Sequence, residues 1–299
     1  MTGSYRLRRG TPDDSRPAFE VFLAAVRDLT RRRGDPWEPD TEELWDELSP
    51  MLDYLAHHAA EWWVAEDEGD GAVIGHARSA ERGGMFELTE LFVHPDRQSA
   101  GLGADLIAHA FPNGRGDVRV IIATTDVRAQ ARYYAAGAVT RFPIVALEGQ
   151  PHPVAPDPAI EIVQIPVEAD IAPLVELERA VIEFDRGDEF RWLLDQREGY
   201  LYRRDGRTVG FSFVGNGGSG PIAALEPDDL IPILGHVETR LAELGVDRLS
   251  LEVPMINEVA MRHLLSRGMR LDSFITLFMS SRPFGQFDRF IGFSPPFFL

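Results

Sequence analysis

The 299-residue sequence contains no cysteine and no lysine. The absence of thiols excludes disulfides, iron–sulfur clusters, thiolate zinc sites and cysteine nucleophiles. The absence of lysine excludes Schiff-base chemistry and the lysine-containing phosphate loop of nucleoside triphosphatases. All 30 basic residues are arginines, a bias that favours a bacterium with GC-rich coding sequences.

Long apolar runs are also lacking. No stretch approaches the ~18 to 20 apolar residues that a membrane span requires, and the first ten residues lack an apolar signal segment. The formal net charge of −18 repels nucleic acid and anionic membranes. We therefore expect a cytoplasmic protein with neither as a partner. The length and an apolar fraction of 44% suit two globular domains.

One glycine-containing loop stands between an expected strand and an expected helix. The strand covers Leu88–Val93, the loop ends at Gly103, and the helix begins at Ala104. Small residues at a helix entry let backbone N–H groups point at an anion, which suits a diphosphate. A dinucleotide-binding G-x-G-x-x-G motif is excluded because Leu106 occupies the third glycine position.

This stretch resembles the acetyl-CoA loop of the GNAT superfamily of N-acyltransferases. The pattern is a strand, V-x-P, then Q/R-x-x-G-x-G/A and a helix, with Gln98, Gly101, Gly103 and Ala104 on the defining positions. The resemblance implies acetyl-CoA as co-substrate and no metal. The residues that it implies for acyl-CoA binding are Leu91, Phe92, Val93, Gln98, Ser99, Ala100, Gly101, Leu102, Gly103, Ala104 and Asp126.

Within this set, the resemblance assigns the backbone of Leu91–Val93 to the pantetheine arm and acyl carbonyl, and the amides of Ser99–Ala104 to the diphosphate. Asp126 stands where the family often has an asparagine that bonds the pantetheine. An ionised aspartate can only accept hydrogen bonds, so this contact differs from the family's.

Three residues are candidates for proton transfer. Tyr133, four residues before Gly137, matches the general-acid tyrosine of the family pattern L-Y-x-x-x-G-F, with a packing tyrosine as the alternative. Glu87 and Glu90 flank the thioester position, and one of them is a candidate base acting through water. Their odd separation places them on opposite faces of a regular strand. We favour Glu90, with Glu87 as a surface residue at the strand end.

The chain reads as two tandem domains. We expect a mixed α/β (α+β) fold with two GNAT-like domains, each a central mixed sheet flanked by helices. The expected bounds are 1–148 for the catalytic domain, 149–158 for a proline-rich linker and 159–299 for the second domain. Residues 124–138 and 255–269 align as an internal repeat, which indicates duplication.

The second half lacks the binding features of the first. Its expected strand Pro221–Leu225 runs through acidic residues into a helix without a glycine loop, and Leu264 replaces the tyrosine. Carboxylates at that helix start would repel a diphosphate. We therefore expect a degenerate GNAT-like domain there.

The implied activity is acetyl transfer from acetyl-CoA to a primary amine by direct attack on the thioester. Acidic residues within 38–47 favour a small cationic acceptor. The resemblance makes Trp37 and Trp45 candidates for substrate contacts, with core packing as the alternative. Two alternatives stay open: a non-catalytic acyl-CoA sensor or scaffold, and an acyltransferase that uses a longer acyl chain. The oligomeric state is left open between monomer and homodimer.

Overall fold

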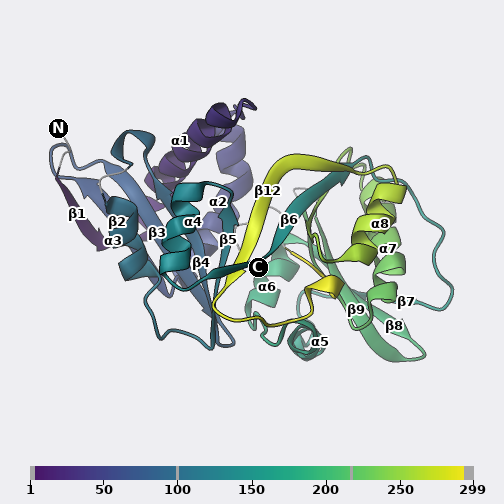
Figure 1. Cartoon of the computed structure of the whole chain (residues 1–299). Coiled ribbons are helices and arrows are strands. Elements are labelled where there is room, and N and C mark those ends of the chain that lie inside the picture. The colour runs from purple at the N-terminus through teal and green to yellow at the C-terminus, as the bar shows by residue number, and fades with distance from the viewer. Residues whose placement is uncertain (1–3, 99–100, 216–217, 293–299) are drawn as a thin grey trace. The chain divides into compact units, whose positions relative to one another are not determined.

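The computed structural model describes residues 4–98, 101–215 and 218–292 (Figure 1). They form a mixed α/β protein, as expected, and divide into two compact units. The first is the chain up to Ile121 together with Asp126–Ala138, and the second is Ile122–Thr125 together with the chain from Val139 onward. No helix in the described ranges is long and apolar enough to cross a membrane.

The first unit contains a sheet with the order β1-β2-β3-β4-β5. Its first four strands pair antiparallel in sequence order, and β4 pairs parallel with β5. The elements of this unit are β1 (Tyr5–Arg9), α1 (Ser15–Arg33), α2 (Thr41–His58), β2 (Glu61–Asp67), β3 (Val73–Arg82), β4 (Met85–Val93), a 3-10 turn η2 (Pro95–Arg97), α3 (Leu102–Ala110), β5 (Val118–Thr124) and α4 (Val127–Ala135).

Helices cover both faces of this sheet. On one face, α1 packs on β3 and β4, and the Arg78 guanidinium donates to the Leu52 carbonyl of α2 at 2.9 Å. On the other face lies α3, where Ser79 Oγ donates to the Ala110 carbonyl at 2.5 Å. Gly75 lets α3 approach closely, because a Cβ there would lie 3.3 Å from both Leu102 and Leu106. The middle strands are therefore buried on both sides.

The second unit contains two sets of strands. In one, β6 pairs antiparallel with β11 on one side and with β12 on the other. The other is a five-stranded sheet with the order β13-β10-β9-β8-β7. The elements are β6 (Val139–Gly149), β7 (Glu161–Ile165), α5 (Ala172–Ile182), α6 (Glu189–Gln196), β8 (Glu198–Arg204), β9 (Arg207–Gly215), β10 (Gly218–Ala224), α7 (Leu230–Glu243), β11 (Leu249–Pro254), α8 (Glu258–Ser266), β12 (Arg270–Ser280) and β13 (Phe290–Ile291).

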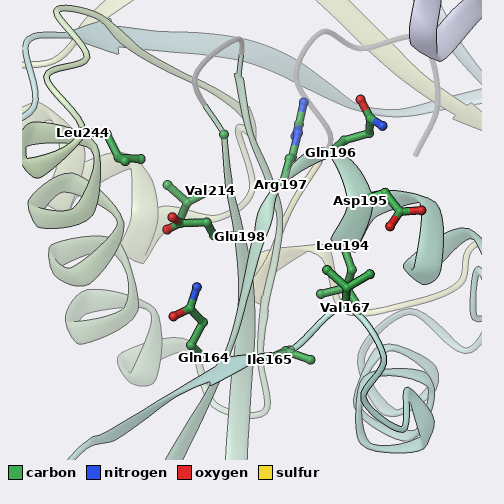
Figure 2. A pocket seen from close by; sticks show the side chains of 11 residues that line it. Gln164, Ile165, Val167, Leu194, Asp195, Gln196, Arg197, Glu198, Val214 and Leu244 are labelled. Atoms are coloured by element: carbon green, nitrogen blue, oxygen red, sulfur yellow. The ribbon is translucent and has the colours of Figure 1, made fainter.

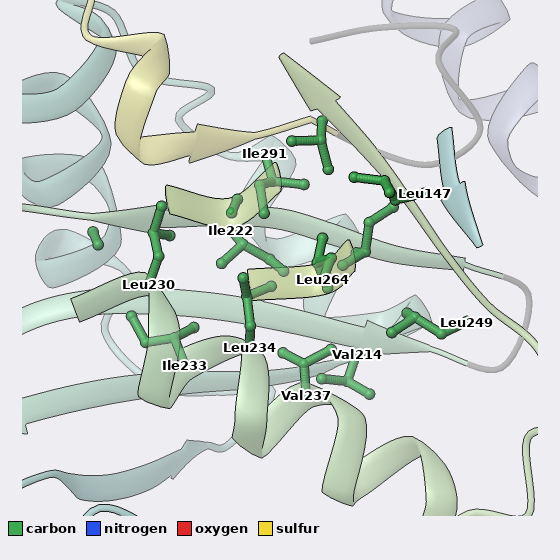
Figure 3. Packing of buried hydrophobic residues seen from close by; sticks show 14 of the residues in the cluster. Leu147, Val214, Ile222, Leu230, Ile233, Leu234, Val237, Leu249, Leu264 and Ile291 are labelled. Carbon is green, nitrogen blue, oxygen red and sulfur yellow. The ribbon is translucent and has the colours of Figure 1, made fainter. Parts of the chain in front are cut away.

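An aliphatic core joins these elements of the second unit. Figure 3 shows Leu147 of β6, Leu234 of α7 and Leu264 of α8 among its members, all at most 1% exposed. Leu264 occupies the position that aligns with Tyr133. An aliphatic side chain suits this dry cluster, where a hydroxyl would need a partner.

The compact units do not follow the predicted domain bounds. Strand β6 follows α4 in the chain, and we expected it as the last strand of the first domain. Its pairing with β11 and β12 instead places the division at Val139, about ten residues before the predicted boundary. The predicted linker 149–158 is also tied down, because Val154 exchanges hydrogen bonds with the Thr239 side chain of α7.

Strand β4 begins at Met85 and α3 at Leu102, three and two residues before the expected Leu88 and Ala104. The sequence pattern also predicts helices over about Thr41–His58 and Glu258–Ser266 and a strand over Glu161–Ile165, and the structure has all three. The helix predicted from Glu168 begins only at Ala172, because the Asp170 side chain accepts from the Ala172 amide at 3.0 Å.

Candidate active site

The N-terminus of α3 is open for an anion. Gly101 adopts φ +88°, a left-handed conformation that favours glycine, and as the N-cap residue it has no side chain that could cap the helix. The Gly101 carbonyl accepts from the amides of Ala104 and Asp105, at 2.8 and 3.2 Å. The amides of Leu102 and Gly103 are therefore the first-turn donors that remain for a ligand. Two predicted contacts, Ser99 and Ala100, lie outside the described residues.

Gly103 leaves room beside this helix start, and Arg132 of α4 borders that room. A Cβ at Gly103 would lie 3.6 Å from Arg132 Nε and 3.8 Å from a Val93 methyl, which is ordinary contact. Sequence reasoning missed Arg132, because its nearness to the loop depends on how α4 packs. A glycine cradle, an uncapped helix start and an adjacent cation together fit a diphosphate.

The end of β4 offers backbone groups next to the loop. The register of β4 with β5 runs from Met85 to Leu88, whereas its pairing with β3 continues to Val93. The carbonyl of Val93 accepts from Gln98 Nε2 at 3.2 Å, so Gln98 ties the loop to the strand. Leu91, Phe92 and Val93 are each half-buried, which keeps them within reach of a ligand.

Asp126 caps α4. Its carboxylate accepts from the Arg128 amide at 2.9 Å and from the Arg128 guanidinium at 2.9 and 3.2 Å, and Arg32 lies 3.5 Å away. The Arg128 side chain lowers the pKa of Asp126 to about 2. Asp126 is therefore an ionised helix cap, and its predicted pantetheine contact stays a prediction.

Tyr133 faces inward from α4. Its side chain is 6% exposed, and burial raises the pKa of the phenol far above its usual value of 10. It is therefore protonated at any physiological pH, as a proton donor must be. The neighbouring Tyr134 is 49% exposed.

Glu87 and Glu90 lie on the same face of the sheet, contrary to the sequence expectation. Glu90 pairs with Arg78 and Glu87 with Ala80, and these two partners are two residues apart on β3. The reason is a β-bulge, in which Thr89 is the extra residue. The expectation that Glu87 is a surface residue was also wrong, because both glutamates are less than 5% exposed.

Each buried glutamate has an arginine partner. Arg82 donates to Glu87 Oε2 at 2.6 Å, a short charge-assisted hydrogen bond. Arg78 Nε lies 3.2 Å from Glu90 Oε2, but this contact lacks hydrogen-bond geometry. Among the described residues, Glu90 Oε2 therefore keeps an unused acceptor position, in a protein where buried polar atoms are normally satisfied.

His76 of β3 lies two residues before Arg78, on the same face of the sheet, and pairs with Phe92 near the end of β4. Its ring is fully buried, 5.6 Å from the ring of Phe92, and burial lowers the pKa of His76 to about 4. The imidazole is neutral at pH 7. His94, by contrast, has a structural position, because its Nδ1 accepts from the Asp96 amide.

Aromatic side chains flank the same face. Phe22 of α1 contacts Phe92 at 5.1 Å and Trp37 at 6.4 Å between ring centroids. Trp45 of α2 packs edge-on to Phe19 and beneath the Arg16 guanidinium. Trp37 is 36% exposed, so this aromatic cluster reaches the surface.

The corresponding helix start of the second unit is acidic. Pro227–Asp229 leads into α7, and Asp229 pairs with Arg204 at 2.9 Å. A cavity of about 360 Å³ lies elsewhere in this unit. Figure 2 shows Ile165, Leu194 and Arg197 among the residues that border it. Burial and the nearby Arg186 lower the pKa of Arg197 to about 9.

Comparison with known proteins agrees with this geometry. Residues 58–137 match the model of the acetyltransferase (GNAT) domain, a segment that contains the α3 loop and Tyr133. No curated protein sequence matches the chain. The domain match supports acyl-CoA-dependent acyl transfer as the general activity.

Solved structures with the same fold cover nearly the whole chain. A putative acetyltransferase from Pyrococcus horikoshii has a TM-score of 0.73 at 17% identity, over 96% of this chain and 92% of that one. A GCN5-related N-acetyltransferase from Sphaerobacter thermophilus has a TM-score of 0.61 at 16% identity, over 93% and 96%. A tandem GNAT protein from the clavulanic acid biosynthesis pathway has a TM-score of 0.58 at 17% identity, over 94% and 99%. Residues 58–137 therefore match a GNAT acetyltransferase domain, and the chain has the fold of a tandem GNAT protein.

Proposed function

We propose that the first unit transfers an acetyl group from acetyl-CoA to a primary amine of a small cationic acceptor. The observation that carries this proposal is the glycine-lined, uncapped start of α3 inside the segment that matches the GNAT domain. When bound, acetyl-CoA supplies an acyl group activated as a thioester, which the amine attacks directly.

The residues of the chain have separate tasks in this proposal. The amides of Leu102 and Gly103 bind the diphosphate, and the backbone of Leu91–Val93 binds the pantetheine arm. Tyr133, held protonated by its burial, donates a proton to the departing thiolate. Its inward position on α4 supports this role.

Glu90 is the better of the two candidate bases. Its Oε2 has an unused acceptor position, so it can take the amine proton through a water molecule. Glu87 is held in a short hydrogen bond by Arg82 and is better suited to stabilising the strand.

Two kinds of side chain support a cationic acceptor. Glu43 and Asp46 are exposed on α2, and Trp37, which is 36% exposed, offers an aromatic face for cation–π contact. Other acids of the region are already engaged: Asp40 caps α2, Glu42 pairs with Arg16, and Glu38 pairs with Arg27 and Arg31. The local negative charge available to an acceptor is therefore smaller than the sequence alone indicates.

In this proposal the second unit has lost donor binding. Asp228 and Asp229 stand at the start of α7, where they would repel a diphosphate. The fully buried Leu264 replaces the candidate acid. This unit then acts as a degenerate GNAT-like domain.

Calorimetry with CoA tests donor binding. Gly103→Glu places a carboxylate beside the helix start and should abolish CoA binding, whereas Gly103→Ala adds a Cβ at ordinary contact distance and should retain it. Unchanged CoA affinity of Gly103→Glu would contradict the proposed loop.

Turnover with a panel of amines tests catalysis and acceptor charge. Polyamines and basic peptide termini should be acetylated faster than neutral or acidic amines, and kcat/KM should fall as salt rises. CoA binding without turnover of any amine would favour the sensor alternative. Faster transfer from longer acyl-CoA donors would favour the long-chain alternative.

A further inference from the structure

The arginines near the start of α3 differ in whether a carboxylate pairs with them. Arg97, just before the loop, pairs with Asp67, and Arg128 of α4 pairs with Asp126 at 2.9 Å. Arg132 makes a hydrogen bond to the Arg128 carbonyl at 3.1 Å, and no carboxylate among the described residues forms an ion pair with it.

The Arg132 guanidinium lies beside the start of α3. Its Nε and Cζ lie 3.6 and 3.8 Å from the point that a Gly103 Cβ would occupy, so the guanidinium borders the cradle at the start of α3. The amide end of a helix and a guanidinium both favour an anion, and their effects add where they converge. The side chain is also half-buried, which limits screening by solvent.

We propose that Arg132 is a donor-selectivity residue, which binds a phosphate group of the acyl donor and makes this chain prefer CoA thioesters over thioesters of pantetheine alone. The inference rests on the proposed function, because it requires that CoA binds at α3. It adds a side-chain cation to a site that is otherwise built from backbone amides.

The test compares CoA with pantetheine, which has the same arm but no phosphate. Calorimetry on the full chain should show that Arg132→Gln weakens CoA binding by about ten- to a hundredfold, the usual effect of losing a charge-assisted hydrogen bond. Pantetheine affinity should stay within about twofold of wild type, because the lost contact involves phosphate only. Arg262→Gln, an exposed arginine of α8 in the second unit, is the matched control for the change in net charge and should leave both affinities unchanged.

Three outcomes would overturn the inference. In the first, wild type binds CoA and Arg132→Gln binds it equally well. In the second, Arg132→Gln loses CoA and pantetheine in the same proportion, which would indicate a packing role. In the third, wild type does not bind CoA at all, and the proposed function then fails together with the inference.

A second variant covers the case in which Arg132→Gln does not fold. Arg132→Lys keeps the positive charge but loses the forked donors, so its preference for CoA over pantetheine should be intermediate. If Arg132→Lys binds CoA no more tightly than pantetheine, although it keeps the positive charge, an electrostatic role of this position is contradicted.

Discussion

Glu87 and Glu90 stand three residues apart on β4 and face the same side of the sheet, because Thr89 is an extra residue between them. The Thr89 hydroxyl donates to the Arg78 carbonyl at 3.1 Å and holds the bulge in place. Both carboxylates are thereby brought under α1 and α2, where each lies near an arginine of β3.

Glu87→Gln should destabilise the fold more than it affects catalysis. The substitution leaves the buried Arg82 cation facing a neutral amide, and breaking a buried pair from one side costs about 3–5 kcal/mol. Denaturant unfolding should show this loss, with kcat nearly unchanged below the unfolding transition. A variant as stable as wild type would mean that water reaches Arg82.

Glu90→Gln should also lower stability, because the buried Arg78 then faces a neutral amide, but unlike Glu87→Gln it should lower kcat as well, at unchanged CoA affinity. An amide cannot accept the amine proton, so the acidic limb of the kcat/KM profile against pH should be lost. If the mutant keeps the wild-type profile and rate, the base lies elsewhere, and the neutral His76 becomes the next residue to test.

Tyr133→Phe should lower kcat by about a hundredfold or more with little change in KM, since the lost proton matters in the transition state. The phenyl ring keeps the packing of a residue that is only 6% exposed. Tyr134→Phe, at the exposed neighbouring position, serves as control and should be as active as wild type. Full activity of Tyr133→Phe would make Tyr133 a packing residue.

Glu252 of β11 should make stability depend on pH. Burial raises its pKa to about 7, and Glu148 and Asp272 add to the effect. Because the folded-state pKa is above the unfolded one, the stabilising contribution is complete below pH ~4.5 and is lost as pH rises through 7. The loss is on the order of 3 kcal/mol.

Glu252→Gln should remove this dependence. The variant should match wild type near pH 4.5 and exceed it in stability at pH 8, as measured by denaturant unfolding at both pH values. Glu161→Gln, at an exposed position of β7, should follow wild type throughout. A wild type whose stability does not fall between pH 5 and 8 would show that Glu252 is hydrated.

The length of a fragment should decide whether the second unit folds. A fragment of residues 139–299 keeps β6, whereas the predicted domain 159–299 lacks it and leaves β11 and β12 without the strand between them. The shorter fragment should lose cooperative thermal unfolding. The longer one should unfold cooperatively and show no thermal shift with CoA, because its helix start is acidic. A clear shift would mean that the second unit binds a donor after all.

Local features of the fold could be predicted from the sequence, and long-range ones could not. The helix Thr41–His58 could be predicted because an apolar stripe recurs along it at helical spacing. The bulge at Thr89 has no local signal, since threonine suits any strand position. The pairing of β6 depends on β12, which was not among the expected elements.

The same limit applies to the candidate site. The glycine loop and Tyr133 stand out as motifs, whereas the role of a charge depends on its neighbours in space. Arg97, Arg128 and Arg132 look alike in the sequence, and only the ion pairs with Asp67 and Asp126 set Arg132 apart.

The position of β6 also sets the order of events during synthesis. The first unit is complete at Ala138, but β6 must wait for β11, whose Leu249 pairs with Gly149 roughly 100 residues later. At a translation rate of ~5–20 residues per second, this apolar strand stays without its sheet partners for about 5–20 s. During that interval the nascent chain exposes the kind of segment that chaperones bind and that pairs with other chains. The yield of folded protein should therefore depend on translation speed between β6 and β11 more than on the stability of the finished fold.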